Sequence, residues 1–303
     1  MPPPSKLRLQ QLAEPTAEAT AEATALATLA AQGGKTSGEL IAEPDVAYAL
    51  FESVDPSTGE FVGFDIDLIK AIAESAGFTV NIVNAPFDPI FINLAAGQFD
   101  LVISAATITE ERSQVVSFSN PYFTAGQVIT VRQADAETIK GAADLVGKKI
   151  GVQLGTTGAA AAKEIPDAQV SEYPTFPEAA QALANGDVDA VVNDDTVSIA
   201  YVLNTPDANL VVVTEPFTTE QYGIAVRKDC TDLLEKVNAG LAEVIASGQY
   251  AEIYRKYFGV DPSADYLPGS EGATPEATAA VTEAATEAAT ATAEATVAAT
   301  ATP

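Results

Sequence analysis

The sequence predicts an α/β protein whose β-sheets are largely parallel. Short apolar runs of strand length alternate with segments that place apolar residues on one helical face, from residue 39 to residue 258. Two such alternating units follow one another, which predicts two lobes. Polar side chains follow several of the expected strands, and α/β sheets bind ligands at the carboxyl ends of their strands. We therefore expect a ligand site in a cleft between the lobes.

In the first unit, residues 64–76 have the pattern of an amphipathic helix. Leu68, Ile69 and Ile72 fall on one face of a helix, and Gly77 follows as a residue that commonly ends helices. Apolar runs bounded by glycine or turn residues predict the strands. The elements expected in this unit are strand 38–42, a hairpin around 55–60, helix 64–76, strand 79–83, helix 90–96, strand 101–103, extended chain at 115–119 and strand 127–131.

The second unit repeats the alternation. Gly155 and Gly158 bracket a turn that leads from a strand into an alanine-rich helix. Residues 221–227 are expected to form one strand that belongs with the first unit, and two helices complete the fold. The elements expected here are a strand ending near residue 152, helix 159–164, strand 170–173, helix 177–185, strand 190–193, helix 196–203, strand 210–213, strand 221–227 and helices 232–247 and 250–258.

The stretch at residues 99–112 organises the rest of the chain. A buried strand at 101–103 runs into three small residues, and Thr109 is placed to cap the following helix. Arg112 would then lie in the first helical turn, where a cation opposes the helix dipole. This placement is easier to understand if the guanidinium faces an anion, such as a carboxylate beside an amine. The alternative, an ordinary solvated arginine, stays open on this stretch alone.

The charge of the chain limits its partners. It carries 42 acidic and 15 basic residues, no histidine, and a net charge of −27. This balance argues against nucleic acid and anionic membrane surfaces as partners. The absence of histidine removes the commonest general base and metal ligand, and a single cysteine, Cys230, excludes an internal disulfide and a cysteine metal cluster. No metal and no cofactor is expected.

Both ends of the chain are low in sequence complexity. Residues 14–31 and 269–303 consist mostly of alanine, threonine and glutamate, without aromatic residues. Such segments bury too little apolar surface to offset the entropy of ordering, so we expect disorder. No apolar run reaches the length of a membrane span. Either the chain is cytosolic or its export signal is not visible here; a low-complexity tether before a folded domain favours the second, with a signal or lipid anchor ahead of it.

Several motifs together make the chain resemble a known family, although each alone is weak. Their order and spacing are specific, and they extend over residues 39–258. They are GFDIDL at 63–68, FD followed by TITEER within 99–112, VSFSNPY at 116–122, GVQLGTTG at 151–158, GDVDA at 186–190, QYGIAV at 221–226 and GQY to YFG at 248–259. The chain thus resembles the periplasmic solute-binding proteins of ABC transporters for polar amino acids, which include glutamine-, histidine- and lysine/arginine/ornithine-binding members.

The resemblance implies a binding protein rather than an enzyme. Two lobes joined by two crossover strands would close over a polar L-amino acid, and the monomeric protein would deliver it, outside the cytoplasm, to an ABC transporter permease. The implied division of the chain is 1–38 tether, 39–125 plus 222–268 lobe 1, 133–216 lobe 2, 126–132 and 217–221 hinge crossovers, and 269–303 tail.

The resemblance also implies a role for each site residue. Arg112 would clamp the ligand α-carboxylate, and Asp194 from the second lobe would pair with the ammonium group. The remaining implied contacts are the carbonyl of Ala105, the hydroxyl and N–H of Thr107, the N–H groups of Thr156 and Thr157 at a helix N-terminus, the rings of Tyr48 and Phe87 around the ligand side chain, and Asp45 at its polar end. In isolation, the two aromatic residues fit core packing equally well, and Asp194 fits helix capping.

Departures from the family pattern bear on the identity of the ligand. Ala49 and Leu50 stand where two prolines are common, and Pro44 precedes Asp45 where a small polar residue is usual. Gln153 stands where glutamine binders tend to carry lysine, which removes a positive charge from the pocket. With two aspartates in the implied site, arginine or lysine is the favoured ligand and glutamine comes next.

Two other functions stay open at this point. The same fold hosts a cyclohexadienyl or arogenate dehydratase type of enzyme, whose positioned acid would have to be a carboxylate already assigned to the ligand. A ligand-binding sensor domain would normally need a membrane span or an output module. Asp195, next to Asp194, is expected at the surface or as a capping residue.

Overall fold

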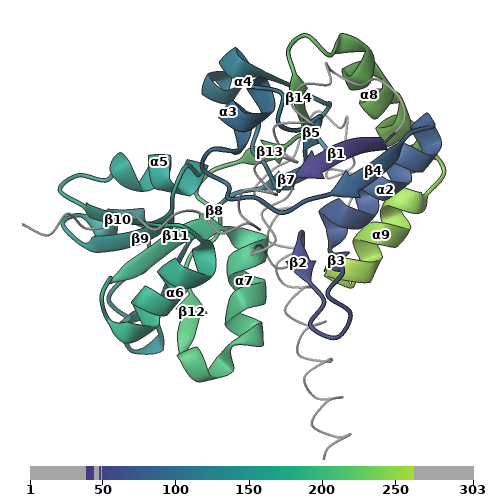
Figure 1. Ribbon diagram of the computed structural model, residues 1–303. Helices are drawn as coiled ribbons and strands as arrows, with labels where there is room; N and C mark the ends of the chain where they lie inside the picture. Colours follow the sequence, from purple (N-terminus) through teal and green to yellow (C-terminus); the bar gives the residue numbers. More distant parts are fainter. Residues whose placement is uncertain (1–38, 44–47, 49, 263–303) are drawn as a thin grey trace, which may run out of the picture.

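The structure is a computed structural model that describes residues 39–43, 48 and 50–262. It has two lobes, each built around a five-stranded sheet with helices packed on it (Figure 1). The expected two-lobed α/β fold is therefore confirmed. Pro44, Asp45 and Ala49 lie outside the described residues, as do both low-complexity ends. Within the described part of the chain, no helix has the length and apolar character needed to span a membrane.

The sheet of the first lobe has the strand order β4-β1-β5-β14-β6. Strand β1 (Glu39–Glu43) runs parallel to β4 (Thr79–Ile82) and to β5 (Leu101–Val102). Strand β14 (Ala225–Arg227) is antiparallel to both β5 and β6 (Val116–Phe118), because the chain returns here from the other lobe. The expectation of a largely parallel sheet is therefore wrong here: two of its four strand pairs are parallel and two are antiparallel, with the parallel part on one side.

The sheet of the second lobe has the order β10-β9-β11-β8-β12. Strand β9 (Lys149–Gln153) runs parallel to β10 (Gln169–Tyr173) and β11 (Ala190–Asp194). Strand β8 (Gln127–Arg132) lies between β11 and β12 (Leu210–Val212) and is antiparallel to both. The parallel strands β9 and β11 therefore end on the same side of the sheet, where ligands of α/β proteins bind.

In the first lobe, helix α2 (Phe64–Ala76) packs against α8 (Thr231–Ala246) and α9 (Gln249–Phe258). Helices α2 and α8 approach closely because Gly240 has no side chain: a Cβ there would lie 2.8 Å from a backbone oxygen of α2. The other elements of this lobe are short. They are α3 (Ile90–Ala95), α4 (Glu110–Val115) and the hairpin strands β2 (Ser53–Val54) and β3 (Phe61–Val62).

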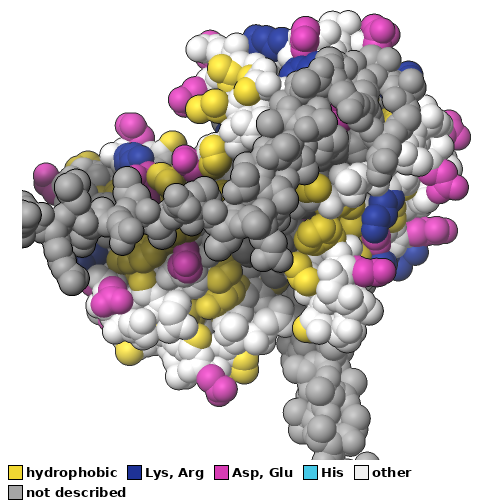
Figure 2. Space-filling model, in the orientation of Figure 1, with side chains coloured by type: hydrophobic (Ala, Val, Ile, Leu, Met, Phe, Trp, Pro, Cys, Tyr) yellow, Lys and Arg dark blue, Asp and Glu magenta, His cyan; other side chains and the backbone are white. Residues whose placement is uncertain are grey.

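Three helices cover the sheet of the second lobe. Helix α6 (Phe176–Asn185) begins with the capping box of Thr175 and Glu178, in which each side chain bonds the other residue's backbone N–H. Acidic side chains are scattered over the visible face of both lobes (Figure 2). The helices are α5 (Thr157–Lys163), α6 (Phe176–Asn185) and α7 (Asp195–Asn204), with short 3-10 turns at Gln133–Asp135, Ala142–Leu145 and Pro206–Ala208.

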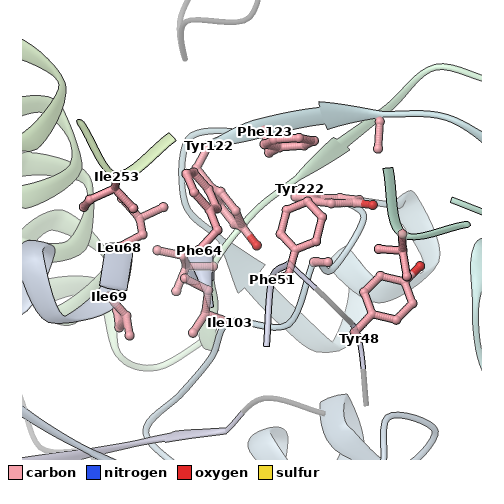
Figure 3. Packing of buried hydrophobic residues seen from close by; sticks show 14 of the residues in the cluster. Tyr48, Phe51, Phe64, Leu68, Ile69, Ile103, Tyr122, Phe123, Tyr222 and Ile253 are labelled. Atoms are coloured by element: carbon pink, nitrogen blue, oxygen red, sulfur yellow. The ribbon is translucent and has the colours of Figure 1, made fainter. Parts of the chain in front are cut away.

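An aromatic core lies in the first lobe beside the connection to the second. The Phe51 ring meets Phe123 edge-on, with centroids 4.9 Å apart, and Phe123 stacks on Tyr222 at 5.6 Å. Figure 3 shows these rings grouped between Phe64 and Tyr48. All but Tyr48 are almost completely buried. Because aromatic contacts of this kind stabilise beyond simple burial, they hold the start of the connection rigidly against the first lobe.

Two short strands connect the lobes. Strand β7 (Phe123–Ala125) pairs antiparallel with β13 (Glu220–Tyr222). Strand β7 continues through Gly126 into β8, and β13 continues into β14. The single strand expected at 221–227 is wrong, because the Gly223 N–H bonds to the Ala106 carbonyl and the chain there changes sheets. The lobe boundaries and the hinge ranges 126–132 and 217–221 stay predictions. Most of the first hinge range coincides with β8, which pairs within the sheet of the second lobe.

Gly126→Ala is expected to lower the free energy of unfolding by about 1–3 kcal/mol. A Cβ at this position would lie 2.2 Å from the Thr218 carbonyl oxygen and 2.7 Å from the Pro216 Cβ, so the two connecting segments would have to separate. Urea denaturation measures the loss. Gly141→Ala is the matched control, since a Cβ there meets nothing within 4 Å; equal stability of the two variants would contradict the close approach.

Candidate ligand-binding site

A pocket with about 310 Å³ of empty space lies where the two lobes meet. This space includes open solvent, because the pocket opens to the outside between the lobes. The structure brings together nine of the ten site residues predicted from the sequence and adds Ser104, which was not predicted; Asp45 lies outside the described residues. The lining residues are Tyr48, Phe87, Ser104, Ala105, Thr107, Arg112, Gln153, Thr156, Thr157 and Asp194.

Arg112 reaches from the first lobe to the second. The Thr109 hydroxyl accepts a hydrogen bond from the Arg112 backbone N–H at 3.1 Å, which confirms the predicted cap of α4. The guanidinium donates to the Thr107 carbonyl at 2.8 Å and to the Gly155 carbonyl at 3.0 Å. It also lies 5.3 Å from the Phe87 ring centroid, within cation–π range. The alternative of a freely solvated surface arginine is therefore wrong.

The surroundings of Arg112 favour an anionic partner. Burial lowers the pKa of the guanidinium, while the charges of Glu220 and Asp194 oppose that shift. An arginine stays protonated in either case, so a partly buried positive charge faces the pocket. A ligand carboxylate can accept from a guanidinium in a bidentate pair, which gives both strength and orientation.

Asp194 ends strand β11 on the opposite wall. It occupies the N-cap position of α7, but its side chain makes no capping bond, so the capping alternative is wrong. Its carboxylate accepts instead from Gln127 Nε2 and from the Tyr222 hydroxyl. Burial, and secondly the charge of Glu220, raise the pKa of Asp194 to about 7. A buried carboxylate whose hydrogen-bond donors are neutral is further stabilised in its charged form when a cation joins it.

Asp195 differs from its expected surface position. It is almost fully buried, and its carboxylate accepts from the backbone N–H of Thr196 at 2.7 Å and from the Thr196 hydroxyl at 3.1 Å. Burial raises the pKa of Asp195 to about 6. These bonds are local, and Asp195 is not among the residues that line the pocket.

The start of helix α5 supplies the threonines of the second lobe. Thr156 is the N-cap, and its hydroxyl accepts from the Ala159 backbone N–H at 3.1 Å. Thr157 is the first residue of the helix, and backbone N–H groups in a first turn lack helical partners. Both residues line the pocket, so backbone N–H groups at this helix N-terminus are available to the ligand carboxylate that the family resemblance implies.

Two aromatic residues form the apolar part of the pocket. The Tyr48 hydroxyl donates to Asn193 Oδ1 at 3.3 Å across the lobes, and the Tyr48 ring lies edge-on to Phe176 at 6.4 Å. Phe87 packs against Phe91 at 5.9 Å. Core packing and pocket lining were alternatives for Tyr48 and Phe87 in the sequence, and the structure shows that each residue does both.

A pair of buried acidic residues supports the floor of the pocket. Ala105 has a left-handed backbone (φ 44°), a strained conformation for alanine. Its N–H donates to Asp65 Oδ2 at 2.7 Å, and the Ser104 hydroxyl donates to Glu52 Oε1 at 2.8 Å. Burial raises the pKa of Asp65 to about 7. These bonds compensate the strain and hold the 104–105 backbone in place.

Glu220 lies directly behind two lining residues of the pocket, Thr107 and Thr157, and like Ser104 it was not predicted from the sequence. Its carboxylate accepts from the Thr107 hydroxyl at 2.6 Å and the Thr157 hydroxyl at 2.7 Å, and so joins the two lobes. It also accepts from Gln127 Nε2 and the Thr218 hydroxyl, each at 3.0 Å. The available signal was an acidic residue at the start of a run expected to form a strand. Its presence makes the charged groups here two carboxylates against one guanidinium.

The described residues offer no alternative centre for metal chemistry. Among them, no group of three or more histidine, cysteine, aspartate or glutamate side chains is arranged to hold a metal ion. The pocket lining offers hydrogen-bonding groups, one cation (Arg112) and one anion (Asp194), a set suited to binding a small zwitterion.

Comparison with known protein families gives one match over most of the chain. The sequence model described as "Bacterial extracellular solute-binding proteins, family 3" matches residues 40–260. The chain is similar to the "Probable histidine-binding protein" of Neisseria gonorrhoeae, with 38% identity over 216 residues, which cover 70% of this chain and 80% of that protein. It is 37% identical over 217 residues to "ABC transporter arginine-binding protein 1" of Escherichia coli (strain K12), covering 70% and 87%.

A solved structure of the same kind is similar throughout its length. It is the arginine-, lysine-, histidine-binding protein ArtJ from Geobacillus stearothermophilus, with 41% sequence identity and a TM-score of 0.71. The similarity covers 75% of this chain and 98% of that protein. The named relatives are binding proteins, not enzymes, which favours binding over the dehydratase alternative.

Proposed function

The chain belongs to family 3 of the bacterial extracellular solute-binding proteins, and on that premise we propose that it captures a polar L-amino acid outside the cytoplasm for an ABC transporter. The ligand we favour is arginine or lysine, and glutamine is the next candidate. Capture requires no covalent step: the lobes close over the amino acid, and the closed form passes it to a permease.

One observation carries this proposal: opposite charges line one small pocket from opposite lobes. Arg112 is held by α4 of the first lobe, and Asp194 ends β11 of the second. An amino acid carries a carboxylate and an ammonium on adjacent atoms, so a single small ligand satisfies both residues. Each charge would otherwise remain in an environment that disfavours it.

The balance of charge supports a cationic side chain. Asp194 and Glu220 together outweigh Arg112 by one negative charge, and Gln153 adds none. A zwitterion with an additional positive charge, as in arginine or lysine, would neutralise the group. Both named arginine-binding relatives agree with this choice of ligand.

Closure would follow from contacts that only the closed form can make. The Arg112 bond to the Gly155 carbonyl and the Tyr48 bond to Asn193 already join the lobes. A ligand held by groups on both lobes adds its free energy to the closed form alone and shifts the population towards it. We further propose that the protein acts as a monomer, tethered to the cell surface or free in the periplasm, with the permease as its partner.

Isothermal titration calorimetry tests the proposal. We expect a dissociation constant in the micromolar range or tighter for arginine or lysine, weaker binding of glutamine, and none of glutamate. Incubation with arogenate and prephenate should leave both unchanged. Binding of no polar amino acid, or turnover of either compound, would refute the proposal.

The affinity for arginine is expected to fall as the pH drops below about 7. Only an ionised carboxylate pairs with an ammonium group, and the pKa of Asp194 in the empty pocket is about 7. Below that value the dissociation constant should rise by up to about tenfold per pH unit. Titrations at pH 8, 7, 6 and 5 measure the slope.

Asp194→Asn provides the control for this pH series. The pKa of Asp65 is also about 7 and that of Asp195 about 6, so either could contribute to the slope. If Asp194 is responsible, the residual affinity of Asp194→Asn should be nearly independent of pH. A wild-type affinity that is the same at pH 8 and pH 5 would contradict the assignment.

A further inference from the structure

Glu220 lies at a place where both lobes and the connecting strand meet. It is 8% exposed, and its carboxylate accepts four hydrogen bonds. The donors come from the first lobe (Thr107), the second lobe (Thr157 and Gln127) and the connecting segment (Thr218). A carboxylate with this many donors is fully satisfied without a ligand, so a ligand has no need to bind it directly.

The bonds to Glu220 restrict what two pocket hydroxyls can do. A threonine hydroxyl has one hydrogen to donate and two lone pairs that accept. An ionised carboxylate only accepts, so Thr107 and Thr157 each spend their hydrogen on Glu220, at 2.6 and 2.7 Å. Both residues line the pocket. Towards a ligand, their hydroxyl oxygens are therefore acceptors only, and one lone pair of the Thr157 hydroxyl already accepts from Gln127 Nε2 at 3.3 Å.

We propose that Glu220 is a positioning residue that fixes the hydrogen-bond polarity of Thr107 and Thr157, so that the pocket selects a ligand with an α-ammonium group. This inference rests on the proposed amino-acid binding and adds the group by which the amino acid is recognised. An ammonium has three donors and no acceptor, which matches the Asp194 carboxylate together with acceptor-only hydroxyls. It also changes the sequence expectation for Thr107, whose hydroxyl was assigned to either the amine or the carboxylate.

The α-hydroxy acid with the same side chain is the informative competitor. It keeps the carboxylate and the side chain of arginine but replaces the ammonium with a neutral hydroxyl that has a single donor. The wild-type protein should therefore prefer L-arginine to this analogue by about 100-fold or more, since hydrogen bonds with a charged partner are the stronger kind.

Glu220→Gln tests the proposal because it keeps the shape of the side chain but no longer requires both threonine hydroxyls to donate to it. A glutamine amide can donate as well as accept, which frees a threonine hydrogen to turn towards the ligand. We expect arginine affinity to fall about tenfold or more and that of the hydroxy acid to change by less than about threefold, so the preference shrinks. Glu215→Gln is the control, since it removes the same charge from an exposed position five residues earlier and should keep the wild-type preference.

The outcomes separate this inference from the proposed function. Equal losses for both ligands in Glu220→Gln, or no loss for either, would overturn the inference while leaving amino-acid binding intact. Wild-type protein that does not bind arginine would refute the favoured ligand instead, and L-glutamine with its 2-hydroxy counterpart would then serve as the probe pair.

A second pair of variants decides the matter if Glu220→Gln does not fold, as judged by circular dichroism. Thr107→Val removes the acceptor oxygen at nearly constant shape and should reduce the preference for the amino acid. Thr107→Ser keeps the hydroxyl and should restore it. A preference that is unchanged in Thr107→Val would overturn the role of this hydroxyl and with it the inference.

Discussion

Arg112→Ala abolishes measurable amino-acid binding if the pocket works as proposed, with an expected rise in the dissociation constant of about 100-fold or more. The variant removes the only basic side chain that lines the described pocket. It leaves the ligand carboxylate partly buried without a cation, which costs more than the loss of an ordinary hydrogen bond. A thermal-shift assay with arginine, followed by calorimetry, measures the effect.

Two further arginine variants make this result specific. Arg112→Lys keeps the charge but loses the planar fork, so its affinity should fall between those of the wild type and of Arg112→Ala. Arg255→Ala removes an exposed arginine that pairs with Asp261 on the surface and should leave affinity unchanged. If Arg112→Ala kept the wild-type response to arginine, Arg112 would have to be removed from the site.

Asp194→Asn is expected to weaken arginine binding by about 100-fold or more, because the ammonium loses its carboxylate partner. Thr107 and Thr157 would still offer neutral acceptors, so some binding should persist at millimolar concentrations. Calorimetry with wild type and variant at pH 8 gives the ratio. Asp207→Asn is the matched control, since Asp207 is exposed and lies in a 3-10 turn of the second lobe.

In the absence of ligand, Asp194→Asn should become more stable relative to the wild type as the pH rises. The folded-state pKa of Asp194 is about 7, above its ordinary value of 3.8, so ionisation opposes folding. This cost is absent below about pH 4, grows up to pH 7, and is complete above it. Relative to wild type, Asp194→Asn should therefore gain stability between pH 5 and pH 8. A constant difference in unfolding free energy at the two pH values would contradict the raised pKa.

Local sequence patterns predicted most of the elements in this fold. The apolar face of residues 64–76 and Gly77 gave the helix with its correct ends. Thr109 was identified as a cap because capping depends on neighbours only three residues away. The prediction of a single strand at 221–227 was wrong because the division of this segment depends on a distant residue: the Gly223 N–H donates to the carbonyl of Ala106, far away in the sequence.

The candidate site shows the same limit. The resemblance placed Arg112, Asp194 and the threonines at the pocket, but the residues alone could not decide between Asp194 as a cap and as a pocket carboxylate. That choice depends on the direction of one side chain, which Tyr222 and Gln127 determine through tertiary contacts. Glu220 had only a weak local signal in the sequence, since its partner Thr107 is 113 residues away.

The central claim is that two charges from opposite lobes hold the two ends of one amino acid. A crystal structure of the protein grown with L-arginine tests it most directly. The account predicts one ligand whose α-carboxylate lies about 3 Å from the Arg112 guanidinium and whose ammonium lies about 3 Å from the Asp194 carboxylate. A bound arginine that contacts only one of these residues, or that lies outside the pocket between the lobes, would contradict it.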